Sequence, residues 1–192
     1  IRRLVEIVKS RLAKQPVLVV SAISKATDIL KKSAQLSENG DTEKARKLLN
    51  DLEDRHYNIC RELLGKDSSH FKNVYNKIQD YFSDIKELLK GVSLLAELSD
   101  RSLAKIITHG ELLSSAIIDA VLNHTNIKTK LIDARDFIYT DNNYLVGEPL
   151  TDKIKSETPK AINNHFEDYK VILTQGFISN TVEKITTTLG RG

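Results

Sequence analysis

The spacing of apolar residues predicts that helices and strands alternate at the start of the chain. Apolar side chains recur every three or four positions over residues 4–12, which is the spacing of one helix face. Pro16 ends this helical region, and residues 17–20 follow as an unbroken Val-Leu-Val-Val run. Such a short, mostly β-branched run is typical of a buried parallel strand. Residues 21–24 then turn the chain into a helix that we expect to reach Ala34.

The middle of the chain has the pattern of two long, highly charged helices. The apolar spacing predicts helices over residues 41–64 and 69–98, separated by Gly-Lys-Asp-Ser at 65–68. Because charged side chains mostly lie at the surface, we interpret the charges as solvated helix faces. The pair predicts a helical hairpin inserted at about residues 41–98. Polar residues that can cap the helix starts are Asp41 or Thr42 for the first helix and Ser68 or Ser69 for the second.

The second half of the chain returns to alternating helices and strands. Ser99 opens a helix whose broad apolar face continues to Leu122, which indicates a well-buried helix. The rest of the pattern predicts a strand at 130–134, a loop at 136–150, a helix at 154–166 with Pro159 near a boundary, a strand at 171–175 and a further strand at 186–189. Strands separated by helices imply an α/β fold with a largely parallel sheet and helices on its faces.

Three short segments follow the predicted strands: residues 21–22, 133–136 and 176–178. In open α/β sheets, ligands bind outside the carboxyl ends of the strands. We therefore expect the functional site among these segments.

Composition narrows the class of protein. The chain has 192 residues, of which 40% are hydrophobic and 29% charged, and this suits one domain with a sizeable core. The net charge of +3 does not indicate a nucleic-acid binder, and no apolar run approaches the roughly 20 residues of a membrane span. Cys60 is the only cysteine, which excludes an internal disulfide, and no signal peptide is visible. We expect a cytoplasmic protein with no nucleic-acid or membrane partner.

Three stretches carry candidate chemistry, and each has an ordinary alternative. The hydroxyl-rich turn at residues 21–27 could hold a carboxylate or phosphate at a helix start, or could be a plain capped turn. Gly110 costs about 1 kcal/mol relative to Ala inside a helix, which suggests close backbone approach or a bend. Beside it, Glu111 could bind an ammonium group or be a surface carboxylate. Arg191, flanked by glycines in the string 186–192, could grip a carboxylate or phosphate, or could belong to a flexible terminus.

Other chemistries find no support in the sequence. The five histidines are scattered and lack the spacing of metal ligands. Cys60 has helical neighbours and is interpreted as a core thiol. Neither a Walker loop nor a GxSxG nucleophile elbow is present. We expect no metal site within this chain.

Five strings in order along the chain resemble the aspartate kinases, which are members of the amino-acid kinase family. The strings are Val19-Val20-Ser21-Ala22 with Thr27-Asp28, His109-Gly110-Glu111-Leu112, Asp133-Ala134-Arg135-Asp136-Phe137, Gln175-Gly176-Phe177-Ile178 and Thr186-Thr187-Thr188-Leu189-Gly190-Arg191-Gly192. The His-Gly-Glu form and the stretch 140–149 look most like the lysine-sensitive monofunctional class. The resemblance covers nearly the whole chain.

The resemblance implies a three-layer α/β/α sandwich of the amino-acid kinase, or carbamate-kinase-like, type. It also implies ATP-dependent phosphorylation of the side-chain carboxylate of L-aspartate to 4-phospho-L-aspartate, with ATP and Mg²⁺ used by the full-length enzyme. This is the first step towards lysine, threonine and methionine. The implied substrate-binding residues are Ser21, Ala22 and Thr27 around the substrate carboxylate, Glu111 on the α-amino group, Phe177 in the pocket wall and Arg191 on a substrate carboxylate.

The sequence also departs from the family pattern. The family's Lys-Phe-Gly-Gly strand, whose lysine contacts the phosphoryl group, is expected upstream of Ile1, and the ATP site is expected beyond Gly192. Ser179 replaces a usual glycine, and residues 182–185 lack another. We therefore expect residues 1–192 to be the amino-terminal aspartate-binding part of the kinase domain, inactive alone. The nucleotide-binding half and regulatory ACT domains, where a feedback amino acid such as lysine binds, are expected elsewhere in a homodimeric enzyme.

Three alternatives remain open at this point. The chain could belong to another amino-acid kinase that acts on a different carboxylate or carbamate. It could belong to a bifunctional aspartokinase fused to homoserine dehydrogenase. A non-catalytic helical module that binds a partner through residues 41–98 is the third.

Overall fold

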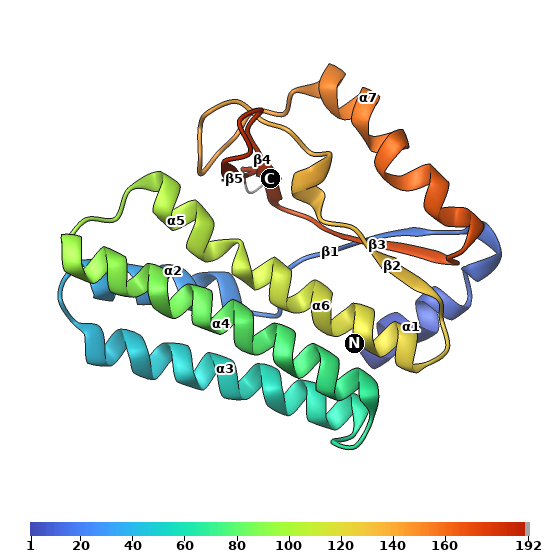
Figure 1. The fold of residues 1–192 in the computed structure, drawn as a ribbon, viewed down its shortest axis with the longest axis horizontal. Helices are drawn as coiled ribbons and strands as arrows, with labels where there is room; N and C mark the ends of the chain where they lie inside the picture. The colour runs from blue at the N-terminus through green and yellow to red at the C-terminus, as the bar shows by residue number, and fades with distance from the viewer. Residues whose placement is uncertain (191–192) are drawn as a thin grey trace.

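The computed structural model describes residues 1–190, and a three-stranded parallel sheet lies at its centre (Figure 1). The strands are β1 (Val17–Val20), β2 (Thr129–Leu131) and β3 (Val171–Gln175), with β3 in the middle. Both pairings with β3 are parallel, and Val20 lies opposite Gln175. All three strands therefore end at the same edge of the sheet.

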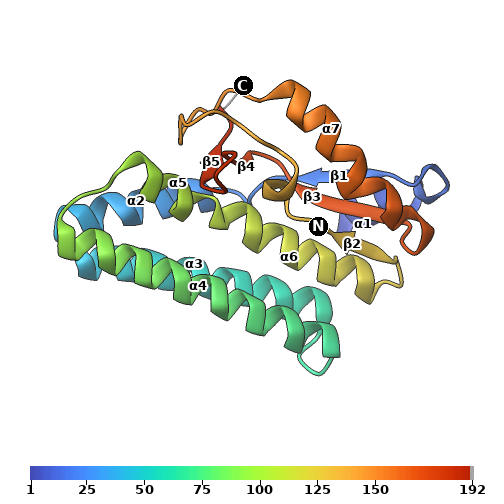
Figure 2. The same cartoon turned by 45° about the horizontal axis from the view of Figure 1, so that its top comes forward.

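Helices cover both faces of this sheet. Along β3, Val171 and Leu173 pack into the main core with helix α6 (His109–His124), while Ile172 packs on the other face with Ile162 of α7 (Thr151–Ile162). Figure 2 shows α7 above the sheet, α6 below it and a further helical layer beyond α6. This arrangement confirms the predicted α/β/α fold.

The further helical layer is built on the predicted hairpin of α3 (Thr42–Leu64) and α4 (Ser69–Leu95), against which α2 (Ala26–Glu38) packs. Their facing sides bury a continuous apolar stripe that includes Leu49, Ile78 and Phe82. The Ser68 hydroxyl caps α4 by accepting from the Phe71 N–H at 3.1 Å, as predicted. Asp41 occupies the N-cap of α3, but its side chain makes no capping hydrogen bond and instead contacts Lys44 at 3.1 Å.

Two predicted helices have different boundaries in the structure. The helix expected from Ser99 to Leu122 is wrong as a single element, because the chain bends at Thr108 between α5 (Asp100–Ile107) and α6. The Thr108 hydroxyl donates to the Lys105 carbonyl at 2.9 Å across this bend. The helix expected to begin in residues 21–24 begins only at Ala26, because Lys25 adopts a left-handed conformation with φ 64°.

The predicted strands also need correction. The strand at 130–134 is shorter, because Asp133 caps a 3-10 turn (Ala134–Asp136) by accepting from the Arg135 N–H at 3.0 Å. The strand predicted at 186–189 is β5 (Thr186–Thr188), which pairs antiparallel with β4 (Ile178–Asn180), an element that the sequence did not predict. This second sheet is separate from the parallel one, because Phe177 turns the chain with φ 65° directly after β3.

The remaining elements lie close to their predicted positions. A helix α1 (Arg2–Lys9) and a 3-10 turn (Leu12–Lys14) precede β1. Pro159 lies inside α7 near its end at Ile162, and the predicted tail of that helix is a 3-10 turn (Asn163–Glu167). Within the described residues, no helix combines the length and the apolar character needed to cross a bilayer.

Candidate functional site

A cavity of about 240 Å³ opens where β1 ends, between the start of α2 and the start of α6. Its wall consists of Ser21, Ala22, Ile23, Lys25, Thr27, Asp28, Glu111 and Phe177. Five of the six site residues expected from the sequence are therefore brought together around one cavity. The sixth, Arg191, lies outside the described residues.

Glu111 is a buried carboxylate in the wall of this cavity. Its side chain is 3% exposed, so the alternative of a surface carboxylate is wrong. The Glu111 Oε1 atom accepts a hydrogen bond from the Ala22 N–H at 3.3 Å. Because a carboxylate is stable in a protein interior only beside donors or cations, this position suits a bound ammonium group.

Gly110 explains how α6 comes so close to the turn after β1. A Cβ atom at position 110 would lie 3.0 Å from the Ala22 Cβ and 3.3 Å from the Thr27 Oγ1. Only glycine leaves room for this contact without a shift of the neighbours. The close backbone approach predicted at Gly110 is confirmed, and it places Glu111 against the turn.

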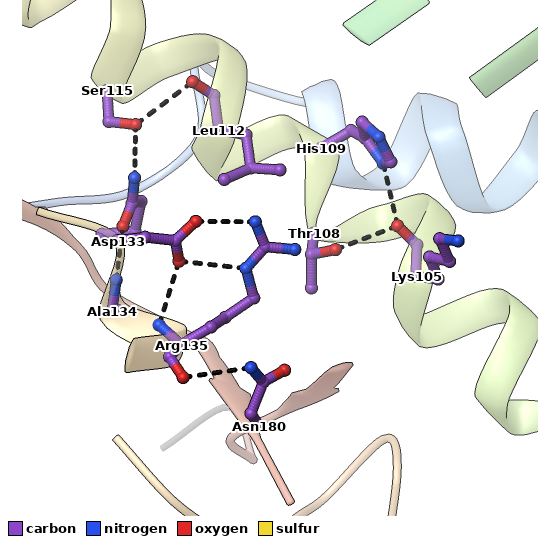
Figure 3. A network of polar contacts seen from close by, with 10 residues as sticks. Lys105, Thr108, His109, Leu112, Ser115, Asp133, Ala134, Arg135 and Asn180 are labelled. Atoms are coloured by element: carbon purple, nitrogen blue, oxygen red, sulfur yellow. Dashed lines mark hydrogen bonds and ion pairs between the residues drawn. The ribbon is translucent and has the colours of Figure 1, made fainter. Parts of the chain in front are cut away.

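Two consecutive serines of α6 also help to hold the ends of the three parallel strands together. The Ser114 hydroxyl donates to the Ser21 carbonyl at 2.7 Å, which holds the end of β1. The Ser115 hydroxyl accepts from the Gln175 side-chain amide at 2.8 Å, and the Gln175 Oε1 accepts from the Ala134 N–H at 2.9 Å (Figure 3). The helix thereby fixes the turns after β1, β2 and β3 relative to one another.

A second polar cluster lies beside the cavity and does not line it. Figure 3 shows the ion pair of Asp133 and Arg135. The Arg135 Nε atom donates to Asp133 Oδ1 at 2.9 Å, and its Nη2 atom donates to Oδ2 at 2.6 Å. Burial opposes ionisation of Asp133, but the Arg135 guanidinium outweighs it and holds the Asp133 pKa below its usual value. The Asn180 side-chain amide donates to the Arg135 carbonyl at 3.0 Å. Segment 133–136 thus supports the site and contributes no cavity wall.

The buried histidine and cysteine side chains have structural surroundings. The His109 Nδ1 atom lies 2.8 Å from the Lys105 carbonyl, and burial lowers the pKa of its ring, which favours the neutral form. Burial raises the pKa of Cys60 to about 12, as expected of an unreactive core thiol. Across residues 1–190, no three His, Cys, Asp or Glu side chains gather as metal ligands.

Sequence reasoning missed three residues of the cavity wall: Ile23, Lys25 and Asp28. Ile23 and Lys25 belong to the turn between β1 and α2, and Asp28 lies in the first turn of α2. The available signal was their position in the sequence beside Ser21 and Thr27. The backbone at Lys25 is left-handed, a conformation that favours glycine. Because the residue there is lysine, the sequence gives no sign of this conformation.

Comparison with known proteins places the chain in a family. Residues 1–192 match the model of the amino acid kinase family. The chain is 28% identical to bifunctional aspartokinase/homoserine dehydrogenase 2 of Arabidopsis thaliana, covering 100% of this chain and 20% of that protein. It is 30% identical to an aspartokinase of Chlamydia trachomatis, covering 100% of this chain and 39% of that protein. The chain thus spans only a fifth to two fifths of the length of these relatives.

The fold is similar to that of solved aspartokinases. E. coli aspartokinase III in complex with aspartate and ADP superposes with a TM-score of 0.81 at 22% identity, covering 92% of this chain and 37% of that one. An aspartate kinase from Clostridium acetobutylicum superposes with a TM-score of 0.66 at 19% identity, covering 100% of this chain and 38% of that one. On the family match over its whole length, together with this shared fold, the chain belongs to the amino-acid kinase family.

Proposed function

We propose that this chain is the aspartate-binding part of an aspartate kinase. The observation that carries the proposal is the buried Glu111 carboxylate, held against the Ala22 N–H in a cavity at the carboxyl end of β1. This is the edge of the sheet where α/β folds bind ligands. The names of the plant and chlamydial relatives support the same reaction class.

In this proposal, each cavity residue meets one group of L-aspartate. Glu111 binds the α-ammonium group, because a buried carboxylate gains most from a cation. The hydroxyls of Ser21, directly after β1, and Thr27, in the first turn of α2, face a substrate carboxylate, which the positive end of the helix dipole also favours. Phe177 closes the apolar side of the cavity. Arg191, outside the described residues, is assigned a substrate carboxylate by the family resemblance.

The proposed reaction needs no covalent intermediate on the protein. A side-chain carboxylate oxygen of aspartate forms a bond to the γ-phosphorus of ATP, while the bond from that phosphorus to the ADP oxygen breaks. Such transfers depend on positioning and charge stabilisation. The cavity lining agrees, since it contains hydroxyls and charges, whereas Cys60 is buried in the helical core.

The residues described here do not account for every component of the reaction. Within residues 1–190, no three His, Cys, Asp or Glu side chains gather as metal ligands, and Mg²⁺ in phosphoryl transfer is held mainly by water, substrate phosphates and one or two carboxylates. We assign Mg²⁺, ATP and the phosphate-contacting lysine to other parts of a longer enzyme. We assign the regulatory ACT domains, feedback by lysine and a homodimer contact to those parts as well. A cytoplasmic role in lysine, threonine and methionine biosynthesis completes the proposal.

The full-length protein that contains this chain allows a direct test. We expect ADP release that depends on L-aspartate, together with an acyl phosphate that hydroxylamine traps as the aspartyl hydroxamate. Turnover with L-glutamate, acetate or carbamate in place of L-aspartate would favour another member of the family. Kinase activity accompanied by homoserine oxidation would identify the bifunctional form, which the plant relatives represent.

The non-catalytic alternative predicts a different result. A partner captured through α3 and α4, with no phosphorylation of any amino acid, would favour the helical interaction module. The isolated chain of residues 1–192 is expected to show no turnover of aspartate and ATP. Turnover by this polypeptide alone would contradict the assignment of the ATP site to the rest of the enzyme.

A further inference from the structure

We propose that Lys25 binds the side-chain carboxylate of the acceptor amino acid and thereby makes the site selective for a dicarboxylic substrate. This inference rests on the proposed function and assigns a residue that the family resemblance does not cover. Among the described residues of the cavity wall, Lys25 is the one cation, beside the acidic Asp28 and Glu111.

The Lys25 side chain has no competing partner within residues 1–190. None of the ion pairs there includes it, whereas Lys86 and Lys160 are paired with Glu53 and Glu157. The ammonium group is therefore available to a ligand in the cavity. Lys25 is exposed, as Lys31 and Lys32 on α2 are, but of these three lysines only Lys25 lines the cavity.

The backbone at Lys25 gives a second, independent observation. Its φ of 64° and ψ of 3° are left-handed, a conformation that glycine adopts easily and a residue with a Cβ does not. Non-glycine residues in this conformation concentrate at functional sites. A glycine at this N-cap position would relieve the backbone, but it would remove the one cation of the described cavity wall.

The charges of the substrate leave one carboxylate for Lys25 to bind. L-Aspartate carries one ammonium group and two carboxylates. Glu111 meets the ammonium group, and Arg191 is assigned one carboxylate, which leaves the second carboxylate without a cation. A lysine ammonium on that group binds it by a charge-assisted hydrogen bond. It also reduces the repulsion between the attacking carboxylate and the γ-phosphoryl group as the new oxygen–phosphorus bond forms and the bond to ADP breaks.

A pair of ligands separates this role from a structural one. L-Asparagine has the shape of L-aspartate, with a neutral amide in place of the side-chain carboxylate. We expect Lys25→Met in the full-length protein to raise the calorimetric Kd for L-aspartate by about tenfold or more. The Kd for L-asparagine should change less than about twofold, because the lost charge has no counterpart on that ligand. The kcat/KM for L-aspartate should fall at least as far as the affinity.

Three further variants separate the charge of Lys25 from its backbone conformation and provide a control. Lys25→Arg keeps the charge and should recover part of the loss. Lys25→Gly suits the left-handed backbone but removes the charge, so it should lose aspartate affinity like Lys25→Met. Lys32→Met, on the exposed part of α2, is the matched control and should leave both Kd values unchanged.

The outcomes distinguish the two proposals. Unchanged aspartate binding in Lys25→Met, or an equal loss for both amino acids, would overturn the role of Lys25 and leave the proposed function intact. If L-asparagine binds the wild type too weakly to measure, recovery by Lys25→Arg without recovery by Lys25→Gly decides for Lys25, and equal behaviour of these two variants decides against it. A wild-type protein that binds no L-aspartate would overturn both proposals.

Discussion

The Ser114 hydroxyl on α6 donates a hydrogen bond to the backbone carbonyl of Ser21, 93 residues earlier in the chain, at 2.7 Å. One turn before it on the same helix, Glu111 accepts from the Ala22 N–H. These two contacts hold the turn after β1 against the helix that carries the candidate ammonium ligand. The cavity therefore depends on α6 for its shape as well as for its charge.

Removing the first contact should loosen the cavity without removing any ligand-binding group. We expect Ser114→Ala to lower the free energy of unfolding by about 1 kcal/mol, because the Ser21 carbonyl loses a buried donor. The KM for L-aspartate should rise several-fold while kcat changes less. Urea unfolding and steady-state kinetics measure the two effects, and an unchanged KM would show that the turn holds its shape without Ser114.

Gly110 allows a prediction in which helix propensity and packing oppose each other. Alanine favours a helix interior by about 1 kcal/mol over glycine. A methyl group at 110 would lie 3.0 Å from the Ala22 Cβ, so the turn after β1 must shift. We expect Gly110→Ala to change stability by less than about 1 kcal/mol but to weaken aspartate binding markedly.

Gly91 in α4 is the matched control for that variant. A Cβ there meets nothing within 4 Å, so Gly91→Ala should stabilise the protein by about 0.5–1 kcal/mol. Aspartate affinity should stay at the wild-type value. Equal effects of the two substitutions on binding would contradict the close packing of α6 against the turn.

The helical hairpin could be predicted from the sequence more fully than the rest of the fold. Apolar residues repeat along α3 and α4 over six or more turns, so the predicted ranges 41–64 and 69–98 lie within three residues of those observed. Apolar spacing did not show the bend at Thr108, because apolar residues continue on both sides of it, and only Gly110 indicated a possible bend nearby. The strand β4 was missed because its buried positions are partly polar. Its Ser179 hydroxyl lies 2.8 Å from the Thr187 hydroxyl, a contact that periodicity cannot show.

The candidate site could also be predicted from the sequence only in part. Ser21, Glu111 and Phe177 lie far apart in the sequence, and composition alone does not place them together. The predicted parallel sheet placed Ser21 and Phe177 at one edge, Glu111 was added by the family resemblance, and the cavity provides the geometry. Neither the sequence pattern nor the family resemblance singled out Lys25, because its left-handed backbone is a property of the folded turn.

The half-buried Asp119 on α6 should make stability depend on pH. Burial raises the pKa of Asp119 to about 6 from 3.8, and Lys77, Asn123 and Lys130 only partly offset this effect. The folded state therefore binds the proton more tightly than the unfolded state. The resulting stability is present below pH 4 and is lost as the pH rises towards 6.

The variant Asp119→Asn should therefore be more stable than the wild type at pH 7.5, by about 1–3 kcal/mol. The difference should vanish at pH 4, where both side chains are neutral in the folded state. Urea unfolding at the two pH values measures it. A variant less stable than the wild type at pH 7.5 would show that the Asp119 charge is stabilised by its neighbours.

For the ion pair of Asp133 and Arg135, removal of the carboxylate charge is expected to lower the stability of the protein at neutral pH. Removing the carboxylate with Asp133→Asn leaves a partly buried guanidinium without its partner and should cost about 1–3 kcal/mol at pH 7. Because Arg135 lowers the Asp133 pKa, this contribution is present above the unfolded pKa and is lost as the pH falls through the folded one. Thermal unfolding at pH 7 and at pH 3 should show the gap between variant and wild type closing.

The central claim is that the Glu111 carboxylate binds the ammonium group of L-aspartate. Glu111→Gln keeps an oxygen that can accept from the Ala22 N–H, replaces the other oxygen by an amide NH₂ and removes the negative charge. Titration calorimetry of L-aspartate into the full-length protein should give saturable binding that weakens by about tenfold or more in Glu111→Gln, while the unfolding midpoint changes little. Equal affinities for L-aspartate in wild type and Glu111→Gln would contradict the claim.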